Sequence, residues 1–80
     1  MGCMGTVHRE PGFTFHIWPN DHRPPHVHVW KGGEVALINL SPVSVRDRRT
    51  MKRRNLRNAV VLVHRHAELL LSKWEALHGA

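Results

Sequence analysis

The chain has 80 residues, which is enough for one domain but leaves little for an elaborate catalytic cleft once a core is built. Its one cysteine, Cys3, excludes an intramolecular disulfide, and no run of apolar residues is long enough to span a bilayer. The formal net charge is +6, from 12 Lys and Arg residues against 6 Asp and Glu residues. These features favour a small cytoplasmic binding domain over a secreted, disulfide-stabilised or membrane protein, and over a self-sufficient enzyme.

Residues 1–11 are expected to be a poorly ordered leader that ends at Pro11. The first six residues also match the pattern for N-terminal myristoylation, with Cys3 as a candidate for palmitoylation. Because this pattern is short, we favour a disordered leader, or a start at Met4, over a lipid anchor. The chain is then a single domain, 1–80, whose ordered part begins near residue 12.

Alternation of apolar and polar residues predicts three antiparallel strands. The strands cover residues 13–18, 26–31 and 34–40, within a sheet region of 12–40. The Pro-rich loop between the first two cannot continue a strand, and Gly32-Gly33 supplies the two-residue turn of a hairpin. This turn pairs Val27 with Ile38 on one apolar face of the sheet. Ser41-Pro42 is expected to end the sheet.

Residues 50–78 follow a helical period, with apolar residues recurring at alternating spacings of four and three. The stripe consists of Leu56, Val60, Val63, Ala67, Leu70, Trp74 and Leu77. It predicts one long helix over most of residues 52–77, with Thr50 or Asp47 as its N-cap. A straight helix of that length would be roughly 40 Å long, so it is expected to overhang the strands or to kink near Asn55 and Asn58. The predicted fold is therefore α+β, a three-stranded antiparallel sheet packed against one long C-terminal helix.

Several apolar side chains fall outside that predicted core. Leu62 and Leu69 lie off the helix stripe, and Trp30 and Leu37 lie on the second face of the sheet. A domain of this size cannot cover both surfaces with its own side chains. We therefore expect a homo-oligomer, most simply a homodimer, that uses one of these surfaces.

The densest chemistry lies in the histidine-rich loop and strand start over residues 21–28. His26 and His28 are two apart on a predicted strand, so their side chains share a face. His22 stands before a stiff Pro-Pro step, and Asp21 adds a carboxylate. Imidazoles and a carboxylate are ligands for a divalent transition metal such as zinc, which makes all four residues candidate metal ligands. The same groups could serve acid–base chemistry near neutral pH, or form a structural loop and a polar sheet face.

Positive charge is concentrated in the second half of the chain. Residues 1–40 carry three basic and three acidic side chains, whereas residues 41–80 carry nine and three. Such a cluster favours a polyanion, because its binding releases counterions from the phosphate backbone. The candidate nucleic-acid contacts are Arg48, Arg49, Lys52, Arg53, Arg54 and Arg57. The same cluster would also suit an acidic protein partner or a solvated basic surface, and no base-reading motif is evident.

The order of motifs along the chain is distinctive. A strand is followed by Asp21-His22-x-Pro24-Pro25-His26-x-His28, then by a Gly-Gly turn with a returning strand, and then by a helix carrying His66 and Trp74. From about Phe13 to Leu77 this order resembles a family of small bacterial proteins, the domain of unknown function numbered forty-one sixty. The resemblance implies a bacterial or phage cytosolic protein, often encoded beside a second small protein and catalogued as a toxin–antitoxin component. The family has no established activity, so no catalytic roles can be transferred to residues of this chain. The cluster of basic residues over 46–57 is heavier here than in the family pattern.

The charge pattern predicts a small basic accessory protein that contacts nucleic acid or a cognate partner protein, and the resemblance implies that it is of toxin–antitoxin type. One alternative is a metal-binding protein or small metal-dependent hydrolase that uses the loop containing His22, His26 and His28. The other alternative is a structural interaction module without any activity.

Overall fold

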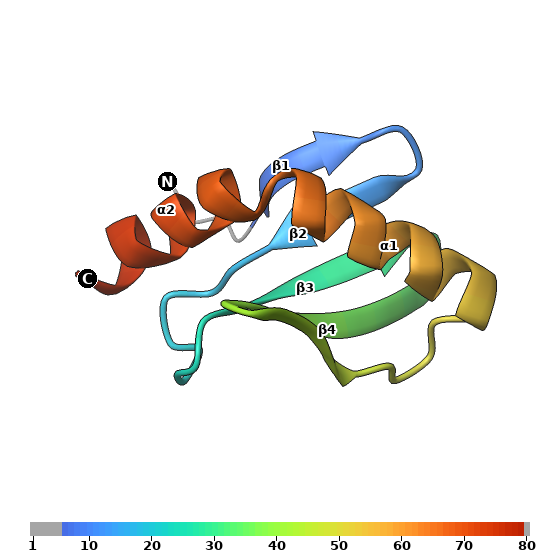
Figure 1. The fold of residues 1–80 in the computed structure, drawn as a ribbon, viewed down its shortest axis with the longest axis horizontal. Helices are drawn as coiled ribbons and strands as arrows, with labels where there is room; N and C mark the ends of the chain where they lie inside the picture. The colour runs from blue at the N-terminus through green and yellow to red at the C-terminus, as the bar shows by residue number, and fades with distance from the viewer. Residues whose placement is uncertain (1–5, 80) are drawn as a thin grey trace.

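The computed structural model describes residues 6–79, so most of the acylation pattern that begins at Met1 lies outside the described residues. Five strands precede two helices along the chain (Figure 1). The elements are β1 (Thr6–Glu10), β2 (Phe13–His16), β3 (His26–Lys31), β4 (Glu34–Leu40), β5 (Val43–Asp47), α1 (Arg53–Arg65) and α2 (Ala67–His78). Both helices run across one face of the sheet, which leaves the other face without a helix (Figure 1).

The sheet has five strands in the order β1-β2-β3-β4-β5, each antiparallel to its neighbours, so the predicted three-stranded sheet is wrong. The edge strands β1 and β5 were not predicted. Residues 6–10, expected to be a poorly ordered leader, contain one apolar side chain, Val7, and therefore lack the alternation that signals a strand. Pairing with β2, through a turn in which Gly12 has a φ of +83°, makes them a strand nonetheless. Likewise β5 continues the sheet past Pro42.

The β3–β4 hairpin confirms the predicted register. Gly32 and Gly33 form the turn, and Val27 pairs with Ile38. Gly32 has a φ of +58°, a conformation in which an L side chain would be strained. Because side chains alternate across a strand, this register places Val27 and Ile38 together in the core.

The predicted single helix is also wrong, because it is broken at His66 rather than kinked near Asn55 or Asn58. His66 has a φ of −111° and a ψ of 20°, outside the α-helical region. A straight helix over 53–78 would be about 39 Å long. The protein's longest dimension is only 34 Å, so a straight helix of that length would extend beyond the molecule. Within residues 6–79 neither helix is long and apolar enough to cross a lipid bilayer.

The core lies between the sheet and the two helices. Strands β2, β3 and β4 contribute buried aliphatic and aromatic side chains, and the helices contribute a stripe that includes three of the predicted residues. The fully buried residues of the core are Phe15, Ile17, Val27, Val29, Ala36, Ile38, Ala59, Val63, Leu70 and Trp74. Leu77, which was predicted to continue the stripe, is 40% exposed, because α2 reaches past the edge of the core at its C-terminal end.

A row of four paired residues, three of them polar, crosses the helix-free face of the sheet. His16 on β2 pairs with His28 on β3, which pairs with Leu37 on β4, which in turn pairs with Asp47 on β5. Residues directly opposite in neighbouring antiparallel strands present their side chains on the same face. His28 of the loop motif and Asp47 of β5 therefore lie on the same face of the sheet, with Leu37 between them.

Candidate functional site

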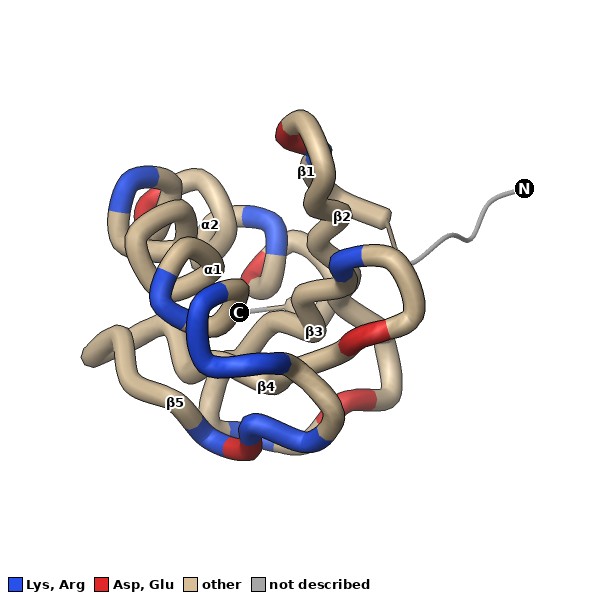
Figure 2. Tube along the Cα trace, turned by 90° about the vertical axis from the view of Figure 1, so that its right-hand side faces the viewer, with Lys and Arg blue, Asp and Glu red and all other residues tan. Residues whose placement is uncertain are grey.

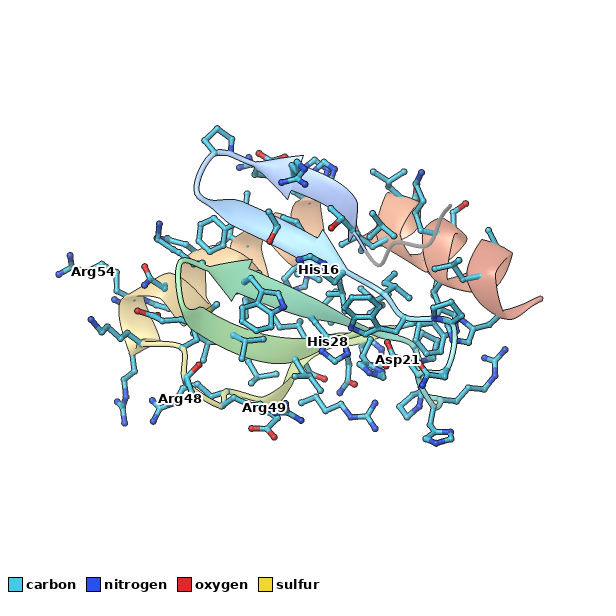
Figure 3. The ribbon with its side chains drawn as sticks, turned by 180° about the vertical axis from the view of Figure 1, so that it is seen from behind. His16, Asp21, His28, Arg48, Arg49 and Arg54 are labelled. Carbon is cyan, nitrogen blue, oxygen red and sulfur yellow. The ribbon has the colours of Figure 1, made fainter. Side chains whose placement is uncertain are left out.

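A pocket of about 420 Å³ opens on the helix-free face, where the loop after β2 folds back over the start of β3. We call it the Asp21 pocket. Its lining combines the histidine-rich loop with residues of β4, β5 and the segment after β5. It consists of Asn20, Asp21, His22, His26, His28, Leu37, Arg46, Asp47 and Arg49. Figure 3 shows Asp21 and His28 side by side in this region, with Arg49 toward the end where α1 begins.

The Asp21 carboxylate is held in place by its own loop. Its Oδ2 accepts the backbone N–H of Trp18 at 2.9 Å, while the backbone N–H of Asp21 donates to the carbonyl of Trp18 at 3.0 Å. Such reciprocal bonds are typical of aspartates that close turns. The fixed Oδ2 lies 3.4 Å from Nε2 of His28 and 3.9 Å from Nε2 of His26. Three potential ligand atoms therefore meet within 4.8 Å of one another.

His26 is only 4% exposed, and its second nitrogen has a defined partner. Nδ1 lies 2.9 Å from the carbonyl oxygen of Pro24 and 3.0 Å from Nη1 of Arg46. A proton on Nδ1 would donate to the carbonyl and leave the lone pair of Nε2 facing Asp21, which is how metal-ligating histidines are commonly oriented. In the opposite tautomer, with the proton on Nε2, Nδ1 would accept a hydrogen bond from Arg46. Nε2 would then lie 3.9 Å from Oδ2 of Asp21, which is too far for a hydrogen bond.

The surroundings of His28 favour the neutral form of its imidazole. Burial lowers its pKa below the ordinary histidine value, and the nearby His26 and Arg49 act in the same direction. Asp21 opposes them by stabilising the charged form, yet the net pKa shift is downward. A neutral imidazole next to a carboxylate is suited to bind a metal ion or to accept a proton. His16, the next histidine in the row, contacts Thr6 and Thr14 with its two ring nitrogens instead, at 3.1 and 3.0 Å.

The C-terminal end of α2 supports the loop from behind. The ring of His78 stacks on Trp74 with centroids 3.7 Å apart, and its Nε2 lies 3.2 Å from the backbone oxygen of Asp21. The Trp74 ring in turn packs against His26 at 5.4 Å. The helix thus ties the loop to the core at Asp21 and at His26.

Three of the four predicted metal ligands are brought together: Asp21, His26 and His28. His22 is exposed and lines the same pocket, but it does not belong to the converging group. Sequence reasoning missed Arg46 and Asp47 as pocket residues. Nothing local marks them, because they reach the pocket only through the pairing of β5 with β4.

The six predicted nucleic-acid contacts divide between two places. Arg49 lines the Asp21 pocket and lies near Asp47, with Nε 3.4 Å from Oδ2. Arg48 and Arg54 extend at the end of the molecule where α1 begins (Figure 3). Lys52, Arg53, Arg54 and Arg57 lie in or beside the first turns of α1, and Figure 2 shows this basic segment close to that of residues 46–49. The backbone of Arg49 is left-handed, with a φ of 47°, which is uncommon for a residue other than glycine.

The fold and the pocket define a small α+β protein with a histidine- and aspartate-lined pocket on an open sheet face. The family model described as "Domain of unknown function (DUF4160)" matches residues 12–75, most of the chain. The chain therefore belongs to the DUF4160 family, as its motif order predicts. Comparison with curated proteins and with solved structures finds no significant match.

Proposed function

We propose that this protein is a small cytoplasmic accessory protein of toxin–antitoxin type that binds nucleic acid through the basic end formed by the start of α1 and the segment before it. One observation carries the proposal. Within residues 6–79, four of the exposed arginines in this region have no acidic side chain within 4.0 Å, whereas Arg49 and Lys52 do. The four are Arg48, Arg53, Arg54 and Arg57.

Uncompensated cations that lie close together repel one another and attract a polyanion. The four arginines come from one short stretch of chain and gather at one end of the molecule (Figure 2). Phosphate contacts of this kind give affinity without reading bases, which fits the lack of a base-reading motif. An acidic cognate protein would use the same charges, and the test below separates the two partners.

The test is a salt titration of binding to a mixed-sequence duplex and to single strands. With four phosphates neutralised, log K should fall with log salt at a slope of roughly −4 on duplex DNA. The variant Arg53→Ala/Arg54→Ala should reduce the slope by about 2 units. The matched control is Arg65→Ala/Lys73→Ala, which removes the same charge from elsewhere on the helices and should leave the slope nearly unchanged. Equal slopes in the two double variants, or no binding to either nucleic acid, would contradict the proposal.

A second candidate function is favoured by the geometry of the Asp21 pocket, namely metal binding or metal-dependent hydrolysis. Tetrahedral zinc with bonds of about 2.05 Å separates its nitrogen and oxygen ligands by about 3.3 Å. Asp21 lies 3.4 Å from His28 and 3.9 Å from His26, so small movements would complete the site. The chemistry that a bound zinc supplies is Lewis-acid polarisation of a substrate oxygen.

The charges of the pocket favour an anionic substrate only with a cation present. Arg46 and Arg49 carry two positive charges, and Asp21 and Asp47 carry two negative ones, so the lining alone has no net attraction for phosphate. A divalent cation held by Asp21, His26 and His28 would give the pocket a positive excess. Arg46 and Arg49 would then hold the substrate's anionic group.

Zinc titration of protein prepared without a histidine tag tests this candidate. The variant His28→Ala should lose one equivalent of bound zinc and the matching rise in melting temperature, because structural metal binding stabilises the fold. His64→Ala, at an exposed position on α1, should lose neither. Identical zinc stoichiometry and melting behaviour in the wild type and His28→Ala would exclude a metal site in the pocket.

A further inference from the structure

A second group of metal-binding side chains lies away from the Asp21 pocket, where β1 meets the break between the helices. His8 and Glu10 are two apart on β1, and His66 occupies the break. Oε2 of Glu10 lies 2.9 Å from Nε2 of His8 and 2.8 Å from Nε2 of His66. The two imidazole rings are 4.3 Å apart and tilted by 47°. The spacing of residues along the chain gives no sign of this group, and only the contact of His66 with β1 reveals it.

Hydrogen bonding within the group leaves one nitrogen unsatisfied. His8 makes a hydrogen bond of normal geometry to Glu10. Nε2 of His66 is buried and, despite its short distance to the same oxygen, has no hydrogen bond of acceptable angle among the described residues. Leaving a buried polar group without a partner costs about 1–3 kcal/mol. Two imidazole nitrogens are therefore directed at one carboxylate oxygen that bonds properly to only one of them.

We propose that His8, Glu10 and His66 form a binding site for a divalent transition metal of the zinc class. One cation would satisfy all three ligand atoms, which already lie within 4.8 Å of one another. Zinc ligands are about 3.3 Å apart, so Glu10 would have to move from the two nitrogens by roughly half an ångström. That displacement is small for a partly exposed carboxylate at the end of an edge strand.

The surroundings of the group suit a metal that joins two elements. The three side chains are 19–23% exposed, so an ion can reach them and a solvent ligand can complete a tetrahedral set. On its inner side the His8 ring packs against Phe15 of the core at 5.3 Å. The site would tie the edge strand β1 to the point where the helix breaks. We assign it a structural role, since no substrate-sized pocket adjoins it among those described.

The experiment uses tag-free, chelator-treated protein in two titrations. Zinc binding is measured by calorimetry and by the change in melting temperature. Cobalt binding is measured by the absorption bands of a tetrahedral site. The variant His66→Ala should lose one equivalent of metal. In that variant the cobalt spectrum should lose the contribution of this site. The metal affinity of this site in His66→Ala should weaken by roughly a hundredfold or more. Even the loss of a residue that hydrogen-bonds to a metal ligand lowers metal affinity by about 10- to 100-fold.

The matched control is His64→Ala, an exposed histidine two residues away, which should bind metal as the wild type does. His28→Ala separates this site from the Asp21 pocket, because it should leave the His66-dependent equivalent intact. Should His66→Ala fail to fold, Glu10→Gln removes the carboxylate while preserving a hydrogen-bond acceptor, and it should lose the same equivalent. The proposal is overturned if Glu10→Gln and His64→Ala bind the same number of zinc ions with the same affinity.

Discussion

The carboxylate of Glu34 on β4 accepts the backbone N–H of Lys52, with 2.9 Å between Oε1 and the nitrogen. The same oxygen accepts a bond from the amide of Asn55 at 3.0 Å. The first turn of α1 has no cap from its own N-cap side chain, and the predicted caps Thr50 and Asp47 do not fill that role. Glu34 therefore caps the helix from a distant strand and supplies negative charge at its positive end. The basic helix start needs no bound phosphate for its stability, so the case for nucleic acid rests on the arginines without acidic neighbours.

This capping predicts an acid-sensitive contribution to stability. The hydrogen bond from Asn55, together with that from the Lys52 backbone, lowers the pKa of Glu34 below its ordinary value of 4.5. A carboxyl whose pKa is lower in the folded state stabilises the fold above about pH 4.5, and this stabilisation is lost as pH falls through the folded pKa. Glu34→Gln should therefore have a lower melting temperature than the wild type at pH 7, with the difference shrinking toward pH 3. The same substitution at exposed Glu75 serves as control, and a Glu34→Gln deficit independent of pH would refute the prediction.

Among single truncations of helix side chains, that of Trp74 is expected to destabilise the folded protein most. It is fully buried and contacts both His26 and His78, so Trp74→Ala should lower the free energy of unfolding by about 3–5 kcal/mol. The exposed Trp30 is the matched control, and Trp30→Ala should cost about 1 kcal/mol or less. Urea denaturation at one protein concentration measures both. Similar losses in the two variants would mean that Trp74 does not anchor the core.

Arg49 allows backbone strain to be separated from charge. Its φ of 47° is unfavourable by about 1 kcal/mol for any residue with a Cβ, but not for glycine. Arg49→Gly and Arg49→Ala both remove the guanidinium, yet the glycine variant should be the more stable by about 1 kcal/mol. If Arg49 holds an anion in the Asp21 pocket, both variants should lose that binding equally. Denaturation measures the difference in stability, and anion titration measures the loss of binding. Equal stability of the two variants, or unequal loss of anion binding, would contradict the prediction.

Self-association is expected through either the open sheet face or the outer face of the helices. Fewer apolar side chains are exposed on each surface than the sequence predicted. Leu37 is buried and Leu62 packs against the core, whereas Trp30 on the open sheet face is 39% exposed and Leu69 on α2 is 41% exposed. Light scattering over rising concentration should detect a homodimer. Trp30→Ser should weaken it if the sheet face is used, and Leu69→Ser if the outer helix face is used. A wild-type protein that stays monomeric at millimolar concentration would exclude both surfaces.

The sequence by itself determines the features that depend on neighbouring residues. The two-glycine turn and the alternation around it determine the β3–β4 register, because loop length and side-chain parity leave one pairing that buries Val27 with Ile38. The spacing of His26 and His28 puts both on one side of β3 for the same reason. Three helix residues of the predicted stripe, Val63, Leu70 and Trp74, are buried as their period requires.

Only the tertiary structure decided the remainder, because it depends on contacts that the local pattern of apolar and polar residues does not encode. β1 is a strand by virtue of its backbone pairing with β2, because its own sequence has one apolar side chain. β5 pairs with β4, and its own strand signal is limited to the alternation of Val43 and Val45. The helix breaks at His66, whose Nε2 lies 2.8 Å from Oε2 of Glu10 on β1. Arg46 enters the Asp21 pocket only because β5 pairs with β4. Local periodicity carries no information about these contacts, so the place of Arg46 and Asp47 in the Asp21 pocket, and the whole group of His8, Glu10 and His66, could be established only once the chain was folded.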